Sequence, residues 1–212
     1  MKYWRIIFLL ILYSSLLQKS FSQSQQVDKK GSEKGEWLFI TNIAFPTLEA
    51  DGLFKVNSVA VEGFFGKEFI LNKSVSIITG IEHLRIKANY NLENQNEYFL
   101  RNNYFTVPVI LNLKYNKDKV ISPYLEIGFY GSYLYYSKLE VERENYKESK
   151  NSLGFSFGMQ VAAGVRFNVT DDFNIYLGLK SKGDLFTSYR SSVQEYKITD
   201  YYGLQLGLGL KL

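Results

Sequence analysis

The chain of 212 residues contains no cysteine, one histidine and two tryptophans. The absence of cysteine excludes disulfide scaffolds, thiolate nucleophiles, and zinc or iron–sulfur sites built on cysteine. The sequence also has no Gly-rich phosphate loop, no metal-ligand spacing and no paired-carboxylate signature. We therefore predict no catalytic, cofactor-binding or metal-binding residue, and no cofactor.

Long hydrophobic runs are missing after the first 22 residues. The longest later run is Trp37-Leu38-Phe39-Ile40, far short of the roughly 20 residues that a membrane-spanning helix needs. At the N-terminus, the basic residues 1–5 precede the apolar stretch 6–17, and the small residues Ser20 and Ser22 follow it. This layout is typical of a cleaved signal peptide, and its apolar stretch is too short for a retained anchor, the alternative.

The basic charge balance comes mainly from this targeting segment. The formal net charge is +4, and residues 1–22 carry three of the basic residues (Lys2, Arg5 and Lys19) and no acidic residue. The remaining chain is close to neutral and has no Lys/Arg cluster with interleaved aromatics, so nucleic acid is excluded as a partner. The polar residues 23–35 are typical of a flexible lead-in on the periplasmic side.

From residue 36 onward the hydrophobic pattern has a period of two, which predicts β-strands. In residues 201–212, leucines at even positions alternate with glycines and polar residues. In residues 153–168, Phe, Met and Val alternate with Gly, Ser and Gln in the same way. Such Gly-rich segments would make poor helices, and as strands they exceed the usual length of about 5–6 residues.

Eight such segments alternate with long and short connections. Connections 47–55, 87–102, 137–152 and 187–198 are long and polar, whereas 70–74, 116–121 and 170–172 are short and contain turn residues. This layout predicts an eight-stranded antiparallel transmembrane β-barrel, an up-and-down meander over residues 36–212, with both termini and the short turns in the periplasm. The predicted strands are 36–46, 56–69, 75–86, 103–115, 122–136, 153–169, 173–186 and 199–212.

A soluble lipocalin-like barrel is the alternative, with its apolar face inside. Two features favour an apolar exterior: the polar face is rich in glycine and opposite charges, and aromatic residues collect near both strand ends, as in a membrane barrel. The expected belt at the short-turn end is Trp37, Phe69, Tyr115, Tyr124, Phe167 and Phe173. The expected belt at the long-loop end is Tyr104, Phe105, Tyr133, Tyr135, Phe155, Tyr201 and Tyr202.

The charged residues on the polar face are expected to fill the lumen. An eight-stranded barrel is just wide enough for side chains inside, and unpaired buried charges are costly. We therefore predict a structural network that pairs acids and bases across strands, with an ion or proton path as the alternative. Its members are Glu62, Glu82, Glu126, Lys114, Arg166 and Lys180.

The single histidine, His83, raises an enzymatic alternative. Some outer-membrane barrels carry out lipid A acyl chemistry with a histidine, a serine and an acid, and such a nucleophile needs its base within hydrogen-bond reach. Glu82 points to the opposite face of the strand and Arg85 is no nucleophile, although Ser58 could approach from another strand. We expect a surface histidine and no enzyme.

The central hairpin resembles the PorT-like outer-membrane barrels. The similarity lies in Asn-Tyr-Phe-Thr-Val-Pro-Val-Ile-Leu-Asn-Leu-Lys-Tyr at 103–115, Ser-Pro-Tyr-Leu-Glu-Ile-Gly at 122–128, the strand 158–168 and the closing Leu-Gly-Leu-Lys-Leu. The last residue departs from the pattern, because such barrels often end in an aromatic residue and this chain ends in Leu212. The resemblance supplies no site residues.

The resemblance implies a small outer-membrane barrel with a structural or partner-binding role, whose namesake acts in type IX protein secretion. We therefore expect a non-enzymatic protein of the cell outer membrane, with outer-membrane lipid and secretion-machinery proteins as partners. A lipid-modifying enzyme and a small channel remain the alternatives. The sequence indicates no oligomeric state.

Overall fold

The computed structural model describes residues 35–50, 54–91, 97–115, 119–141, 146–189 and 196–211. The predicted signal peptide and residues 23–34 of the lead-in lie outside these ranges. No helix within the ranges is long and apolar enough to cross a membrane. Their regular structure consists of β-strands: β1 (Glu36–Ala44), β2 (Thr47–Ala50), β3 (Phe54–Ile70), β4 (Val75–Asn91), β5 (Glu97–Lys114), β6 (Ile121–Val141), β7 (Tyr146–Asn168), β8 (Phe173–Tyr189), β9 (Tyr196–Asp200) and β10 (Tyr202–Lys211).

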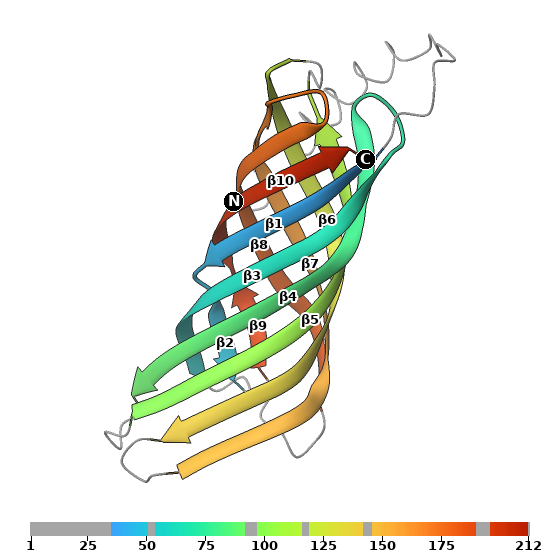
Figure 1. Ribbon diagram of the computed structural model, residues 1–212. Helices are drawn as coiled ribbons and strands as arrows, with labels where there is room; N and C mark the ends of the chain where they lie inside the picture. The colour runs from blue at the N-terminus through green and yellow to red at the C-terminus, as the bar shows by residue number, and fades with distance from the viewer. Residues whose placement is uncertain are drawn as a thin grey trace, which may run out of the picture. The chain divides into compact units, whose positions relative to one another are not determined.

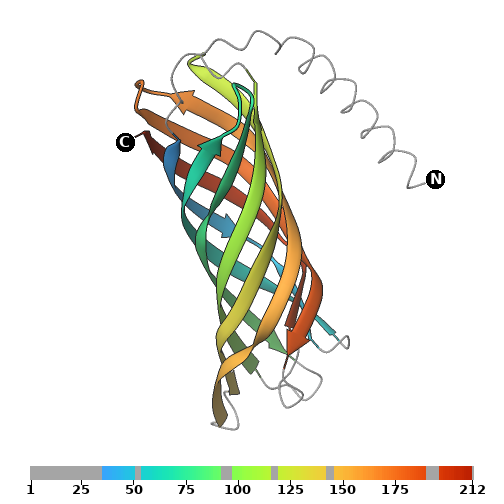
Figure 2. The same cartoon turned by 90° about the vertical axis from the view of Figure 1, so that its right-hand side faces the viewer.

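The strands close into a ring (Figures 1 and 2). β3 to β8 pair antiparallel in chain order, and β1 closes the ring by pairing with both β3 and β10. β1 and β2 share one position in the wall and are separated at Phe45 and Pro46, while β9 and β10 share another and are separated at Tyr201. The ring therefore has eight positions, and the predicted antiparallel barrel is confirmed.

The strands extend through most of the connections that were predicted to be long loops. β6 and β7 continue to the pair Val141↔Tyr146, and β4 and β5 continue to Asn91↔Glu97. Opposite charges support the longer hairpin, because Lys147 lies 3.6 Å from Glu140 across the strands. A polar sequence thus forms strands here without an apolar face to mark them.

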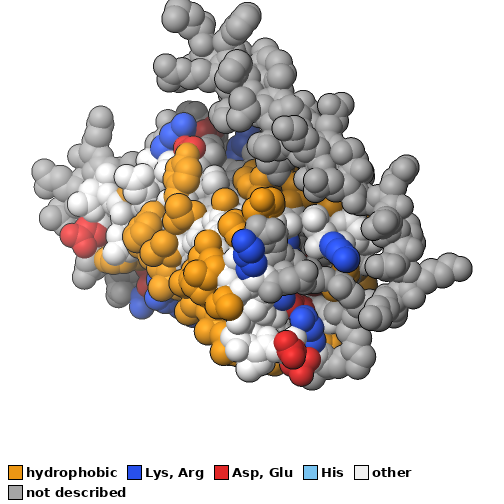
Figure 3. All heavy atoms as spheres, turned by 90° about the horizontal axis from the view of Figure 1, so that it is seen from above, with side chains coloured by type: hydrophobic (Ala, Val, Ile, Leu, Met, Phe, Trp, Pro, Cys, Tyr) orange, Lys and Arg blue, Asp and Glu red, His pale blue; other side chains and the backbone are white. Residues whose placement is uncertain are grey.

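The apolar face points outward, as predicted. Along β10, Leu204 is 68% exposed and Gln205, on the other face, is 3% exposed. Hydrophobic side chains gather on the barrel wall seen from the short-turn end in Figure 3. Three of the residues expected in the aromatic belts instead point inward and are buried: Tyr104, Tyr124 and Tyr201.

Glycines on the inner face make room for these inward rings. Tyr130 on β6 lies directly opposite Gly158 on β7. A Cβ added to Gly158 would lie 2.4 Å from the Tyr130 ring, a distance at which atoms overlap. The alternation of glycine with apolar residues in β7 therefore reflects rings that lie across the neighbouring strand.

Pro108 in β5 lacks the N–H that a strand ladder uses. The pairing of β4 with β5 skips from Thr79↔Val109 to Glu82↔Thr106 at this point, while the Thr79 hydroxyl donates to the Pro108 carbonyl at 2.8 Å. The register shift in the pairing of β5 with β6 lies elsewhere, between Asn103 and Tyr104. Pro108 thus interrupts one ladder without a bulge.

Candidate functional site in the barrel interior

The interior near the short turns holds an arginine–glutamate pair. Arg166 on β7 lies 2.8 Å from Glu36 on β1, and both side chains are almost fully buried. Asn174 and the Tyr176 hydroxyl donate to the same carboxylate, each at 2.6 Å. Glu36 thus has donors on both carboxylate oxygens.

A second pair lies at the same end. Lys114 on β5 lies 2.6 Å from Glu68 on β3. Ser76 also donates to the Glu68 carboxylate, and Asn112 donates to it at 3.3 Å. Together the two pairs tie β1, β3, β5 and β7 together across the lumen.

Two lysines and two glutamates form a closed quartet farther from the short turns. Lys180 lies 2.5 Å from Glu62 and 2.8 Å from Glu82. Lys182 lies 2.5 Å from the other oxygen of Glu62 and 2.6 Å from the other oxygen of Glu82. Each carboxylate therefore binds both ammonium groups, and the charges balance. Tyr201 adds a hydrogen bond to Glu62 at 3.0 Å.

Asp184 is a buried acid that is satisfied without a lysine or arginine. The Tyr130 hydroxyl donates to one of its oxygens at 2.8 Å, and the backbone N–H of Ile198 donates to the other at 2.9 Å. This carboxylate therefore links β6, β8 and β9.

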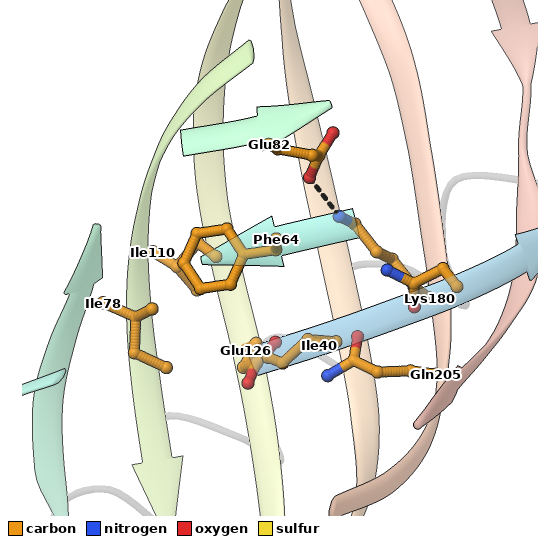
Figure 4. A pocket seen from close by; sticks show the side chains of 9 residues that line it. Ile40, Phe64, Ile78, Glu82, Ile110, Glu126, Lys180 and Gln205 are labelled. Atoms are coloured by element: carbon orange, nitrogen blue, oxygen red, sulfur yellow. Dashed lines mark hydrogen bonds and ion pairs between the residues drawn. The ribbon is translucent and has the colours of Figure 1, made fainter. Parts of the chain in front are cut away.

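Glu126 lines a small cavity between the charged layers (Figure 4). The cavity measures about 10 Å³, room for about one water molecule. Within the described residues, Oε1 of Glu126 and Oδ1 of Asn42 are both buried without a hydrogen-bond partner, and both residues line this cavity. A water that donates to both oxygens would satisfy them.

Two apolar clusters occupy other parts of the lumen. One lies around the cavity and consists of Leu38, Ile40, Phe64, Ile78, Ile110, Tyr124 and Tyr176. The other consists of Ala44, Leu48, Val56, Ala60, Leu84, Ile86, Ala88, Leu100, Tyr104, Leu134, Tyr196, Ile198 and Tyr201. The interior is thus not uniformly polar, because apolar layers alternate with charged ones.

The six residues predicted for the lumen network are all buried. The structure brings Lys180 together with Glu62 and Glu82. Lys114 and Arg166 instead meet acids outside the predicted set. Glu126 departs from the expected pairing, because no lysine or arginine of the described chain lies within 4.0 Å of it. Its position beside an apolar cluster explains this.

Four buried charged residues were missing from the predicted set: Glu36, Glu68, Lys182 and Asp184. The alternation did contain the signal. Glu68 shares a strand face with Glu62, and Lys182 and Asp184 share one with Lys180. Reading every charge on each inward face would have found them.

His83 lies on the outer face of β4. Its Nε2 is 2.9 Å from the Tyr135 hydroxyl, and its ring packs edge-on against Phe105. Ser58 is buried and donates to the Pro46 carbonyl, so it is not hydrogen-bonded to His83. The described part of the chain contains no group of three acidic or histidine side chains that could hold a metal ion.

Comparisons with known proteins agree with this architecture. The sequence model of the family described as "Outer membrane protein beta-barrel domain" matches residues 54–182. No curated protein matches the chain. Among solved structures, Neisserial surface protein A is 13% identical with a TM-score of 0.51, over 85% of this chain and 100% of that one. At this identity the similarity shows the fold alone.

Two further solved structures are similar at lower scores. Ail, the attachment invasion locus protein of Yersinia pestis, is 14% identical with a TM-score of 0.44, over 85% of this chain and 99% of that one. The outer membrane protein OprG of Pseudomonas aeruginosa is 10% identical with a TM-score of 0.46, over 87% of this chain and 99% of that one.

Proposed function

The chain belongs to the outer membrane protein beta-barrel domain family and lies in the outer membrane, and we propose that it is a closed, non-enzymatic barrel with a structural and partner-binding role. One observation carries the proposal: buried charged, polar and apolar side chains occupy the described lumen, and the cavity beside Glu126 measures only about 10 Å³. A filled lumen leaves the outer surface and the strand ends as the parts of the protein that other molecules can reach.

The filled lumen argues against the channel alternative. A solute would have to separate the quartet of Glu62, Glu82, Lys180 and Lys182, whose contacts are 2.5 to 2.8 Å long. Breaking a buried ion pair costs about 3–5 kcal/mol. We therefore expect planar bilayers that contain the purified protein to show no stepwise conductance, and reproducible single-channel steps would favour a channel.

A four-stranded sheet that projects beyond the rest of the ring supports partner binding. β4 and β5 pair to Asn91↔Glu97, whereas β3 pairs with β4 only from Ser58↔Ala88. Likewise β6 and β7 pair to Val141↔Tyr146, whereas β8 pairs with β7 only from Gly154↔Tyr189. Between Tyr146 and Gly154, β7 pairs with β6 on one side. Its other edge has no neighbouring strand there among the described residues. An open edge of this kind can pair with an extended segment of a partner.

The enzymatic alternative lacks its predicted serine beside His83, whose hydrogen-bond partner is the Tyr135 hydroxyl. His83 lies on the outside of the wall, whereas Ser58 is buried and bonded elsewhere. A lipid A acyltransferase or deacylase needs a nucleophile within hydrogen-bond reach of its base.

For the finer role, we propose that the protein is PorT-like and assists protein secretion of the type IX kind, with a cleaved signal peptide and periplasmic termini. This rests on the resemblance of residues 103–128 to that family. Photo-crosslinking residues placed at Ser149, on the projecting sheet, and at Lys73, in a short turn, test it in intact cells. Secretion proteins captured from either position would support the role. If neither position captures a secretion protein, the role in secretion is rejected. The proposal of a closed barrel is unaffected by that result.

A further inference from the structure

Three basic side chains form a row across the outer face of β4, β5 and β6, and a fourth lies beside them on β4. Lys87 lies directly opposite Arg101, and Arg101 lies directly opposite Lys138. Arg85 lies two residues along β4 from Lys87, on the same face. Lys87, Arg85 and Arg101 are exposed and Lys138 is half-buried. We call these four residues the basic row.

The register of the basic row is unfavourable for the protein alone. Like charges directly opposite on one face of a sheet destabilise it. Within the described residues, neither Lys87 nor Arg101 has an acid within 4.0 Å, and Arg85 only donates to the Asn103 side chain at 3.1 Å. Glu140 contacts Lys138 at 2.6 Å but is also 3.6 Å from Lys147.

Two other cations at the same end of the barrel lie directly opposite acids. Lys197 on β9 is directly opposite Glu49 on β2, and Lys147 on β7 is directly opposite Glu140. The basic row therefore differs from the rest of this end, since its cations face one another. An anion from outside the chain would remove the repulsion.

The basic row lies where the wall becomes apolar. On β3, Val59 is directly opposite Lys87 and Val61 is directly opposite Arg85, and these valines are 49% and 53% exposed. On the same outer face, Phe105 and Val107 of β5 follow toward the middle of the wall. In an outer-membrane barrel, this border between polar and apolar wall is the level of the lipid headgroups.

We propose that the basic row binds the phosphate group of an anionic membrane lipid. Guanidinium groups bind phosphate oxygens through two parallel hydrogen bonds, and lysines add point charges. The acyl chains of the same lipid would lie along the neighbouring apolar wall. This continuity favours a lipid over a free phosphate, which would gain nothing from Val59, Val61 or Phe105. The site depends on the membrane location and is independent of any role in secretion.

The test uses the full protein in phosphatidylcholine nanodiscs that contain a small fraction of phosphatidic acid. The lipids retained by the released protein are counted by native mass spectrometry. The test variant is K87Q/R101Q. The control is K55Q/K197Q, which removes the same charge at the same end, where Lys55 and Lys197 both neighbour Glu49. Gel mobility with and without boiling checks that each variant is folded.

We expect the wild type to retain phosphatidic acid in preference to phosphatidylcholine, K87Q/R101Q to lower this preference about tenfold, and the control to keep it within about twofold. Equal retention of the two lipids by the wild type would overturn the proposal. An equal loss in the control would also overturn it, because net charge would then be the cause. Full displacement of the lipid by millimolar inorganic phosphate would reject the lipid as the ligand.

Discussion

Removal of Lys182 is the sharpest test of the lumen quartet. The K182M variant leaves Lys180 to neutralise both Glu62 and Glu82. Glu62 keeps hydrogen bonds from Asn42 at 2.5 Å and Tyr201 at 3.0 Å, whereas Oε1 of Glu82 loses its partner at 2.6 Å. The perturbation therefore falls mainly on Glu82.

The expected loss follows from this geometry. Removing one partner of a buried ion pair costs about 3–5 kcal/mol. Because Glu62 keeps other donors, we expect a loss near the lower end, about 3 kcal/mol. Lys182 also lies 4.8 Å from the Tyr201 ring and 5.4 Å from the Tyr130 ring, and the loss of these cation–π contacts acts in the same direction. K182M/E82Q restores the charge balance and should recover part of the loss.

Urea unfolding in phosphatidylcholine vesicles measures these changes. Trp37, which stacks on Phe65 at 5.3 Å, reports unfolding by fluorescence. The midpoint should fall in K182M with little change in the slope. The control is K150M, which breaks an exposed 3.0 Å contact with Glu148 and should cost at most about 1 kcal/mol. A loss below about 1 kcal/mol in K182M, or no recovery in K182M/E82Q, would refute the reasoning.

Four further predictions follow from single residues. E126Q removes a buried carboxylate without a cation and should raise the free energy of unfolding at neutral pH by about 1–3 kcal/mol, and a loss in the same urea assay would contradict this. G158V places a side chain against Tyr130 and should cost about 1–3 kcal/mol, whereas G131A, with no atom within 4 Å of the added Cβ, should leave the urea midpoint unchanged. The hydrogen bond from Lys138 lowers the pKa of Glu140. This contact in the projecting hairpin is therefore fully present above the ordinary pKa of glutamate and is lost as the pH falls through the lowered pKa. NMR titration should show a higher pKa for Glu140 in K138Q. H83A should leave the lipid A of cells unchanged by mass spectrometry, because Ser58, the candidate serine, is hydrogen-bonded to Pro46 and not to His83, and a missing or added acyl chain would revive the enzymatic alternative.

The strand count and the outward apolar face were predictable because a period of two is a local property of the sequence. The strand ends that project beyond the ring were less predictable. Residues 138–150 alternate in charge rather than in polarity, and their strands are supported by contacts such as Lys147 with Glu140. Such contacts form between neighbouring strands outside the apolar wall, where no hydrophobic alternation is required.

The choice of ion-pair partners could not be predicted from the pattern, because it depends on how the strands are staggered around the barrel. Alternation places Lys114, Arg166 and Lys180 inside, but only the ring brings Lys114 to Glu68 and Arg166 to Glu36. These two acids lie near the short turns, at the same level as their partners. Glu126 lies between this level and the quartet, beside an apolar cluster, and no lysine or arginine of the described residues lies within 4.0 Å of its carboxylate.

The number of buried charges sets a limit on any complete pairing. The described interior holds six acids (Glu36, Glu62, Glu68, Glu82, Glu126 and Asp184) and four bases (Lys114, Arg166, Lys180 and Lys182). If each base balances one acid, two acids must be stabilised by other means. Asp184 accepts hydrogen bonds from a tyrosine and a backbone N–H, whereas Glu126 accepts one from the Gln205 side chain, and its Oε1 has no partner beside the water-sized cavity. Loss of charge at Glu126 should therefore stabilise the barrel, whereas loss of charge at Glu62 or Glu82 should destabilise it, although all three glutamates point into the same lumen.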